Sequence, residues 1–103
     1  MRILRRPQAM ADAEAIADWI GRDSAKSALR FLESVEVTLR RLAEFPASGS
    51  PLVLENVALA HARFARGVGF HSYIVFYIEH QQAIEIIRIL HGARDIEGEL
   101  SES

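Results

Sequence analysis

Arginine, histidine and tyrosine side chains gather between residues 63 and 94, on segments rich in the β-branched and aromatic residues typical of strands. Guanidinium groups bind phosphate and carboxylate, whereas imidazole and phenol groups can carry protons. Such a set has the parts that metal-free RNA cleavage requires: a base, an acid, and cations on the developing charge. Its members are Arg63, Arg66, Tyr73, Tyr77, Arg88, His91 and Arg94.

Some of these residues also have a structural interpretation. Arg88 interrupts an apolar run, so a carboxylate must pair with it if it is buried: Glu85, Asp95 or one on a helix. Arg94 follows a glycine at a strand end, where functional loops tend to lie, but it could equally hold the sheet end. Trp19, the single tryptophan, is either an aromatic at the edge of the core or a contact for a partner.

Motifs for other chemistry are absent from the sequence. Gly67-Val68-Gly69 is too short for a phosphate loop, and no HExxH or serine nucleophile motif occurs. The four histidines lack the spacing of metal ligands, and there is no cysteine. We therefore expect neither a metal nor a cofactor, and no residue stands out confidently as catalytic.

Length and charge bound the class of protein. The 103 residues are enough for one domain, and a net charge of −2 argues against strong direct binding of nucleic acid. No apolar run is long enough to cross a membrane, and no signal-peptide core follows Met1, so a cytoplasmic protein is expected. Of twelve cations, eleven are arginine. That bias hints at paired or interface cations, because arginine favours bidentate pairing.

The elements that must position these side chains centre on a β-hairpin. Residues 73–79 and 83–90 form two strand-length runs, and the polar residues 80–82 predict a loop of three to five residues between them. The second run is almost continuously apolar, as in a central strand covered on both faces. Residues 61–66 predict a preceding strand, with Arg63 and Arg66 on opposite sides, and residues 67–69 predict the turn.

The first half of the chain predicts a short strand and two helices. Residues 2–6 are strand-like, and apolar spacings of three and four over residues 8–23 indicate an amphipathic helix. Asp23 or Ser24 can cap a second helix, which Phe45-Pro46 ends. Residues 47–51 are a loop by composition, whereas residues 52–60 are open between a brief strand and a helical turn.

Together these elements predict an α+β fold of order β-α-α-β-β-β. An N-terminal strand and an antiparallel two-helix hairpin pack on one face of a small, twisted, mostly antiparallel sheet, and the other face is left for a partner. Residues 1–96 form a single domain, and residues 97–103 are expected to be a short, flexible acidic tail with Glu97, Glu99 and Glu102.

Residues 3–96 also resemble the RelE/ParE superfamily of bacterial type II toxin–antitoxin toxins, specifically its ParE-like branch. The matching stretches are Ala13 to Ile20, residues 28–32 with Leu42, Pro46 and Gly49, Arg63, Tyr73 to Tyr77, and Arg88 to Asp95. The resemblance implies the same strand–helix–helix–three-strand fold. It further implies a growth-arresting toxin, associated with plasmid stabilization, in a hetero-oligomeric complex with a ParD-like antitoxin from the adjacent gene.

The resemblance leaves two activities and a third alternative. ParE-like members inhibit DNA gyrase by binding, whereas RelE-like members are ribosome-dependent mRNA endoribonucleases; a divergent, inactive member would mainly bind its antitoxin. The net negative charge, the single lysine, Lys26, and the non-basic Ser72 and Ala93 favour the gyrase-binding toxin. No aromatic acid–base residue follows the last strand, which also disfavours cleavage.

The candidate site residues differ between these activities. A nuclease would use Arg63, Arg66, His91 and Arg94. A surface that binds the target or the antitoxin would comprise Trp19, Arg63, Arg66, Tyr73, Arg88, His91 and Arg94.

Overall fold

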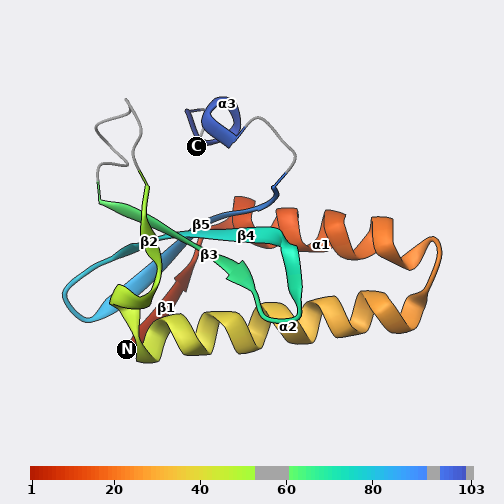
Figure 1. The fold of residues 1–103 in the computed structure, drawn as a ribbon, viewed down its shortest axis with the longest axis horizontal. Coiled ribbons are helices and arrows are strands. Elements are labelled where there is room, and N and C mark those ends of the chain that lie inside the picture. The colour runs from red at the N-terminus through yellow and green to blue at the C-terminus, as the bar shows by residue number, and fades with distance from the viewer. Residues whose placement is uncertain (53–60, 93–95, 102–103) are drawn as a thin grey trace.

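A five-stranded mixed sheet with helices against both faces forms the fold, shown in Figure 1. The structure is a computed structural model that describes residues 1–52, 61–92 and 96–101. In chain order the elements are β1 (Arg2–Arg5), α1 (Pro7–Gly21), α2 (Ala25–Glu44), the 3₁₀ turn η1 (Pro46–Ser48), β2 (Ser50–Pro51), β3 (Ala62–Gly67), β4 (Phe70–Glu79), β5 (Ala83–His91) and α3 (Ile96–Ser101).

The sheet has the strand order β1-β5-β4-β3-β2. Strand β1 runs parallel to β5 and the other neighbours are antiparallel, which confirms the predicted α+β fold and the central position of β5. Three residues, 80–82, join β4 to β5 as predicted. Strand β2 lies in the stretch predicted as loop, where Ser50 and Pro51 pair with β3. Residues 53–60 lie outside the described part, which leaves their sequence-based alternatives open.

The helical hairpin packs on the sheet through two complementary stripes. Pro7 opens α1 with a backbone already suited to a helix, and Ala9, Ala13 and Ala17 then recur every four residues and are buried. The small side chains of this stripe let α1 pack closely against its neighbours. Helix α2 contributes larger buried side chains, those of Phe31, Val35, Leu39 and Leu42. Ser24 is the N-cap of α2, and its hydroxyl accepts a hydrogen bond from the Ser27 amide.

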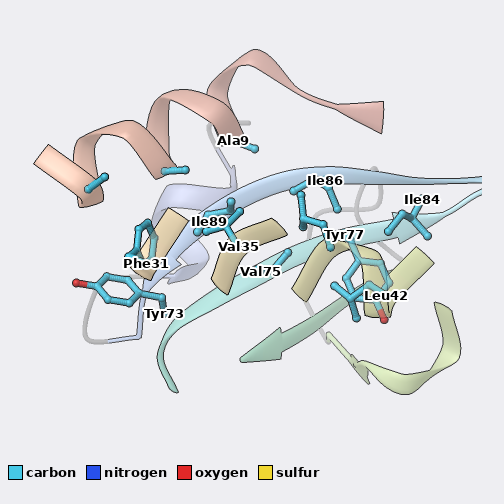
Figure 2. Close-up of a cluster of buried hydrophobic side chains, with 13 residues drawn as sticks. Ala9, Phe31, Val35, Leu42, Tyr73, Val75, Tyr77, Ile84, Ile86 and Ile89 are labelled. Atoms are coloured by element: carbon cyan, nitrogen blue, oxygen red, sulfur yellow. The ribbon is translucent and has the colours of Figure 1, made fainter. Parts of the chain in front are cut away.

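Two apolar clusters lie on opposite faces of the sheet. The helical-hairpin face packs Tyr73, Val75, Tyr77, Ile84, Ile86 and Ile89 under α1 and α2 (Figure 2). The other face packs Ala62, Ile74, Phe76, Ile87 and Leu90 against Leu100 of α3. This second cluster corrects the expectation of an uncovered face, because residues 96–101 are helical and Leu100 is fully buried. The apolar residues Ile96 and Leu100 are four apart, one helical turn, within an otherwise acidic segment.

Tyr77 on β4 hydrogen-bonds to the segment that follows α2. Its hydroxyl donates to the Pro46 carbonyl at 2.7 Å and accepts from the Gly49 amide at 3.0 Å. A Cβ at Gly49 would overlap this hydroxyl, which explains the glycine. Tyr77→Phe should leave a buried carbonyl and amide without this partner and lower the free energy of unfolding by about 1–3 kcal/mol. Urea unfolding would measure the loss, with Tyr73→Phe as the matched control; a Tyr77→Phe protein as stable as wild type would contradict it.

Glu85 links the start of β5 to Arg6 and His80. Its carboxylate accepts from Arg6 at 2.7 Å and contacts the His80 ring at 2.9 Å, and both contacts, Arg6 foremost, lower its pKa below the ordinary 4.5. Because the folded pKa is the lower one, this stabilisation is complete above pH 4.5 and is lost as pH falls through the folded value.

Removing the Glu85 charge should therefore make the free energy of unfolding depend less on pH in the acid range. In Glu85→Gln, the free energy of unfolding should drop by up to about 1 kcal/mol near neutral pH, since the pair is partly exposed, and by less at acid pH. Chemical unfolding at pH 7 and at pH values below 4.5 measures the difference. An equal loss at every pH would show that the charge of Glu85 contributes nothing.

Candidate functional site

The second half of β5 has an open edge beside α1. Strand β1 pairs with β5 only from Ala83 to Ile86, so no β1 residue lies opposite the rest of the strand. A groove of about 850 Å³ follows this edge. Its lining comes from α1 and the residue that caps its C-terminus, and from β4 and β5: Gln8, Ala11, Asp12, Ala15, Ile16, Trp19, Arg22, Tyr73, Arg88, Ile89, Leu90 and His91.

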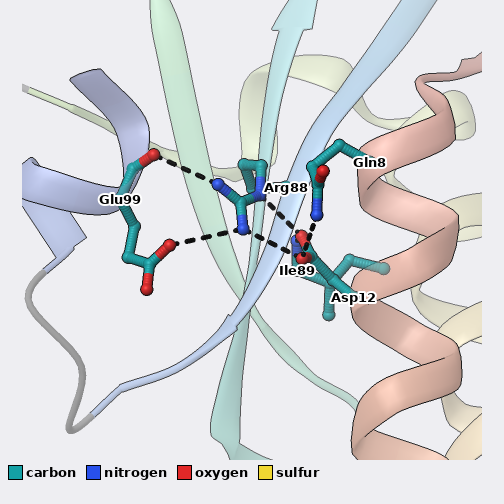
Figure 3. A network of polar contacts seen from close by, with 5 residues as sticks. All are labelled: Gln8, Asp12, Arg88, Ile89 and Glu99. Atoms are coloured by element: carbon teal, nitrogen blue, oxygen red, sulfur yellow. Dashed lines mark hydrogen bonds and ion pairs between the residues drawn. The ribbon is translucent and has the colours of Figure 1, made fainter. Parts of the chain in front are cut away.

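Arg88 and Asp12, which both line the groove, form a buried ion pair that Figure 3 shows. Arg88 donates from Nε to Asp12 Oδ2 at 2.8 Å and from Nη2 to Oδ1 at 2.9 Å. Asp12 also accepts from the backbone amide of Ile89 at 3.0 Å, which satisfies an edge amide that no strand reaches. This bidentate pair raises the pKa of Arg88, so the guanidinium stays charged.

A β-bulge aims Arg88 at this position. Phe76 pairs with Arg88 but Tyr77 pairs with Ile86, so Ile87 is an extra residue in β5. A bulge re-aims the side chains around it. Arg88 thereby reaches Asp12 on α1 and also Glu99 on α3, donating to the Glu99 carbonyl at 3.1 Å and to its carboxylate at 3.4 Å. One side chain thus joins the helices on both faces of the sheet.

Two aromatic side chains, Trp19 and Tyr73, line the groove. Trp19 is 62% exposed although α1 is otherwise amphipathic, which favours its interpretation as a partner contact over that as a core-edge residue. The Tyr73 ring is buried between Phe31 and His91, with ring centroids 5.0 and 5.2 Å away. Burial raises the pKa of Tyr73, so its phenol is neutral at physiological pH. Tryptophan and tyrosine are enriched at protein–protein interfaces, and both line this groove.

The charged side chains that line the described groove are Arg22, Arg88 and Asp12. Arg88 is paired with Asp12, which leaves Arg22 as the cation of this lining that can meet an acidic ligand.

The other predicted arginines lie elsewhere. Arg63 and Arg66 are on opposite faces of β3, since Ala65 belongs to the cluster under the helical hairpin and Phe64 to the cluster under α3. Arg63 donates to the Gly49 carbonyl at 2.7 Å and borders a separate 490 Å³ pocket. Arg66 donates to the His71 carbonyl at 2.7 Å. Among the described residues, the set expected for nuclease chemistry is thus divided between surfaces.

Three candidate residues meet in the groove with Trp19: Tyr73, Arg88 and His91. Arg94 lies in residues 93–95, outside the described part, so its role stays a prediction. Sequence reasoning missed Asp12, Arg22 and Glu99. The apolar run around Arg88 did signal a buried partner, including one on a helix, but only the three-dimensional arrangement identifies it as Asp12.

Within the described residues, no group of three or more histidines, cysteines and carboxylates is placed to hold a metal ion. None of the helices that the structure describes is long and apolar enough to span a membrane.

The fold is similar to that of a solved structure. A toxin–antitoxin structure, the chromosomal ParDE system from P. aeruginosa, superposes with a TM-score of 0.67, covering 88% of this chain and 95% of that chain at 18% identity. At that identity the likeness establishes the fold alone. No curated protein sequence matches the chain.

The family assignment rests on a sequence match over most of the chain. Residues 3–96 match the model of the ParE toxin of the type II toxin–antitoxin system parDE. The chain belongs to this family, which confirms the resemblance seen in the sequence.

Proposed function

We propose that this ParE-family toxin arrests growth by binding and inhibiting DNA gyrase, and that a ParD-like antitoxin from the adjacent gene neutralises it. The observation that carries the proposal is the family match over residues 3–96, which spans nearly the whole fold. The proposal places both proteins in the cytoplasm, in a hetero-oligomeric complex.

The antitoxin docks, in this proposal, along the α1–β5 groove. An open strand edge offers backbone groups to an extended segment, and an adjacent apolar trough accepts the face of a helix. Trp19 and Tyr73 supply large aromatic surfaces of the kind that dominate binding energy. Arg22 at the groove favours a carboxylate on the incoming segment.

Binding is favoured over mRNA cleavage for a geometric reason. General acid–base chemistry needs its base, acid and cation within hydrogen-bond reach of one scissile bond. Arg63 and Arg66 lie on opposite faces of the sheet and donate to backbone carbonyls. The net charge of −2 is also poor for association with RNA.

Controlled expression in a bacterial host tests the toxin and its neutralisation. Induction should arrest growth, and co-expression of the small open reading frame next to the gene should restore growth and yield a co-purifying complex. An arrest that this partner leaves unchanged would contradict neutralisation. Arrest accompanied by ribosome-dependent mRNA cleavage, with gyrase fully active, would assign the protein to the RelE-like activity instead.

A further inference from the structure

Strand β4 turns a corner near its start, at residues 71–73, which we call the β4 corner. Between Arg66 and Gly67 the pairing of β3 with β4 shifts, so no β3 residue lies opposite residues 71–73. Extra residues of this kind bend a strand and re-aim its side chains. Figure 1 shows the bend, which brings the start of β4 and the β3–β4 turn towards α2.

Two sets of hydrogen bonds hold the β4 corner in place. From β3, Arg66 donates from Nη1 to the His71 carbonyl at 2.7 Å. From α2, the buried Ser34 hydroxyl donates to the Val68 carbonyl in the β3–β4 turn. The Thr38 hydroxyl, also buried, accepts from the Val68 amide at 3.0 Å. The turn is therefore fixed on α2 through both polar groups of one backbone residue, and Arg66 fastens the corner that follows.

Aromatic rings connect the β4 corner to the α1–β5 groove. Phe70, which precedes the corner, packs edge-on against Phe31 of α2, with ring centroids 5.7 Å apart. Phe31 also contacts Tyr73 at 5.0 Å, and Tyr73 contacts His91 at 5.2 Å. Tyr73 is the last residue of the corner and lines the groove. The position of its ring in the groove therefore depends on how the corner is held.

We propose that Ser34, Thr38 and Arg66 are positioning residues for partner binding, which hold the β4 corner so that the Tyr73 ring is in place before the partner arrives. The described lining of the groove includes none of the three. A side chain already held in its bound position does not have to be ordered during binding, and this raises affinity. The inference rests on the proposed function, in which the antitoxin docks in the α1–β5 groove.

The affinity of the purified protein for its antitoxin, measured by isothermal titration, tests this role. Thr38→Val keeps the shape of the side chain but removes the acceptor of the Val68 amide, and Arg66→Ala removes the donor to the corner. Each should weaken binding by about two- to tenfold, the range that corresponds to ordering one side chain. Tyr77→Phe also removes hydrogen bonds to the backbone, but at the opposite end of β4, and should change affinity by less than about twofold.

Double variants show whether the loss of affinity passes through Tyr73. Once Tyr73→Leu has removed the ring, adding Thr38→Val should cost little further affinity. In a Trp19→Ala background the full loss should remain, because Trp19 lies on α1 and has no part in the corner. A general loss of stability would instead weaken binding equally in both backgrounds.

Hydrogen exchange gives a second readout, which needs no partner. The Gly92 amide donates to the Ser72 carbonyl of the β4 corner at 2.7 Å. Local opening of the corner should therefore speed exchange of this amide in Thr38→Val and Arg66→Ala, and leave it unchanged in Tyr77→Phe.

The contrary outcomes separate this inference from the proposed function. Wild-type affinity in both corner variants, or an equal loss from Thr38→Val in both backgrounds, overturns the positioning role and leaves the groove as the docking site. Failure of the wild-type protein to bind the antitoxin overturns the proposed function. The exchange rate of the Gly92 amide then still decides whether Thr38 and Arg66 hold the corner.

Discussion

Replacing Asp12 with alanine is expected to lower the free energy of unfolding by about 3–5 kcal/mol. The change leaves the Arg88 guanidinium buried without its bidentate partner and removes the acceptor of the Ile89 edge amide. Urea or thermal unfolding of the purified protein measures the effect. Asp18→Ala, an exposed carboxylate on the same helix, is the control and should change stability by no more than about 0.5 kcal/mol.

A double variant distinguishes a buried ion pair from a general packing defect. Asp12→Leu combined with Arg88→Met removes both charges and fills similar volume, so part of the lost stability should return relative to Asp12→Ala. Strictly additive losses from the two sites would show that the pair does not act as a unit. A stable Asp12→Ala protein would contradict the structural role assigned to Arg88.

Replacing Trp19 with alanine is expected to weaken antitoxin binding by about 30-fold or more, corresponding to about 2 kcal/mol. The indole is mostly exposed in the free protein, so the loss of binding should come without a comparable loss of stability. Isothermal titration with the purified antitoxin, alongside unfolding of each variant, separates the two effects.

Leu29 provides the matched control for Trp19. It is exposed to a similar degree, 63% against 62%, but lies on α2 and does not line the groove. Leu29→Ala should keep its affinity within about twofold. If Trp19→Ala binds as wild type while Leu29→Ala binds weakly, the antitoxin docks on the outer face of the hairpin and the groove assignment is wrong.

The regular elements could be predicted because their patterns are local. The four-residue recurrence of small residues in α1 and the apolar stripe of α2 specify buried faces regardless of what they pack against. The apolar run of β5 similarly indicated a strand covered on both faces, and the polar residues 80–82 indicated a short loop. Even the division of Arg63 from Arg66 was implicit in the alternation of β3.

The groove could not be predicted because it depends on where elements end. Strand β1 stops at Arg5, which opens the edge of β5, and a bulge at Ile87 turns Arg88 towards it. Neither feature leaves a periodic signal. The cover of the second sheet face was also missed, because only one apolar pair, Ile96 and Leu100, packs α3 against it.

The supercoiling reaction of purified DNA gyrase tests the central claim most directly. The reaction contains ATP and relaxed plasmid, and the toxin is titrated alone and with its antitoxin. The account predicts that the toxin inhibits supercoiling or traps cleaved DNA, and that the antitoxin restores activity. Gyrase that remains fully active at saturating toxin would contradict the account, and mRNA cleavage on ribosomes by the same preparation would replace it.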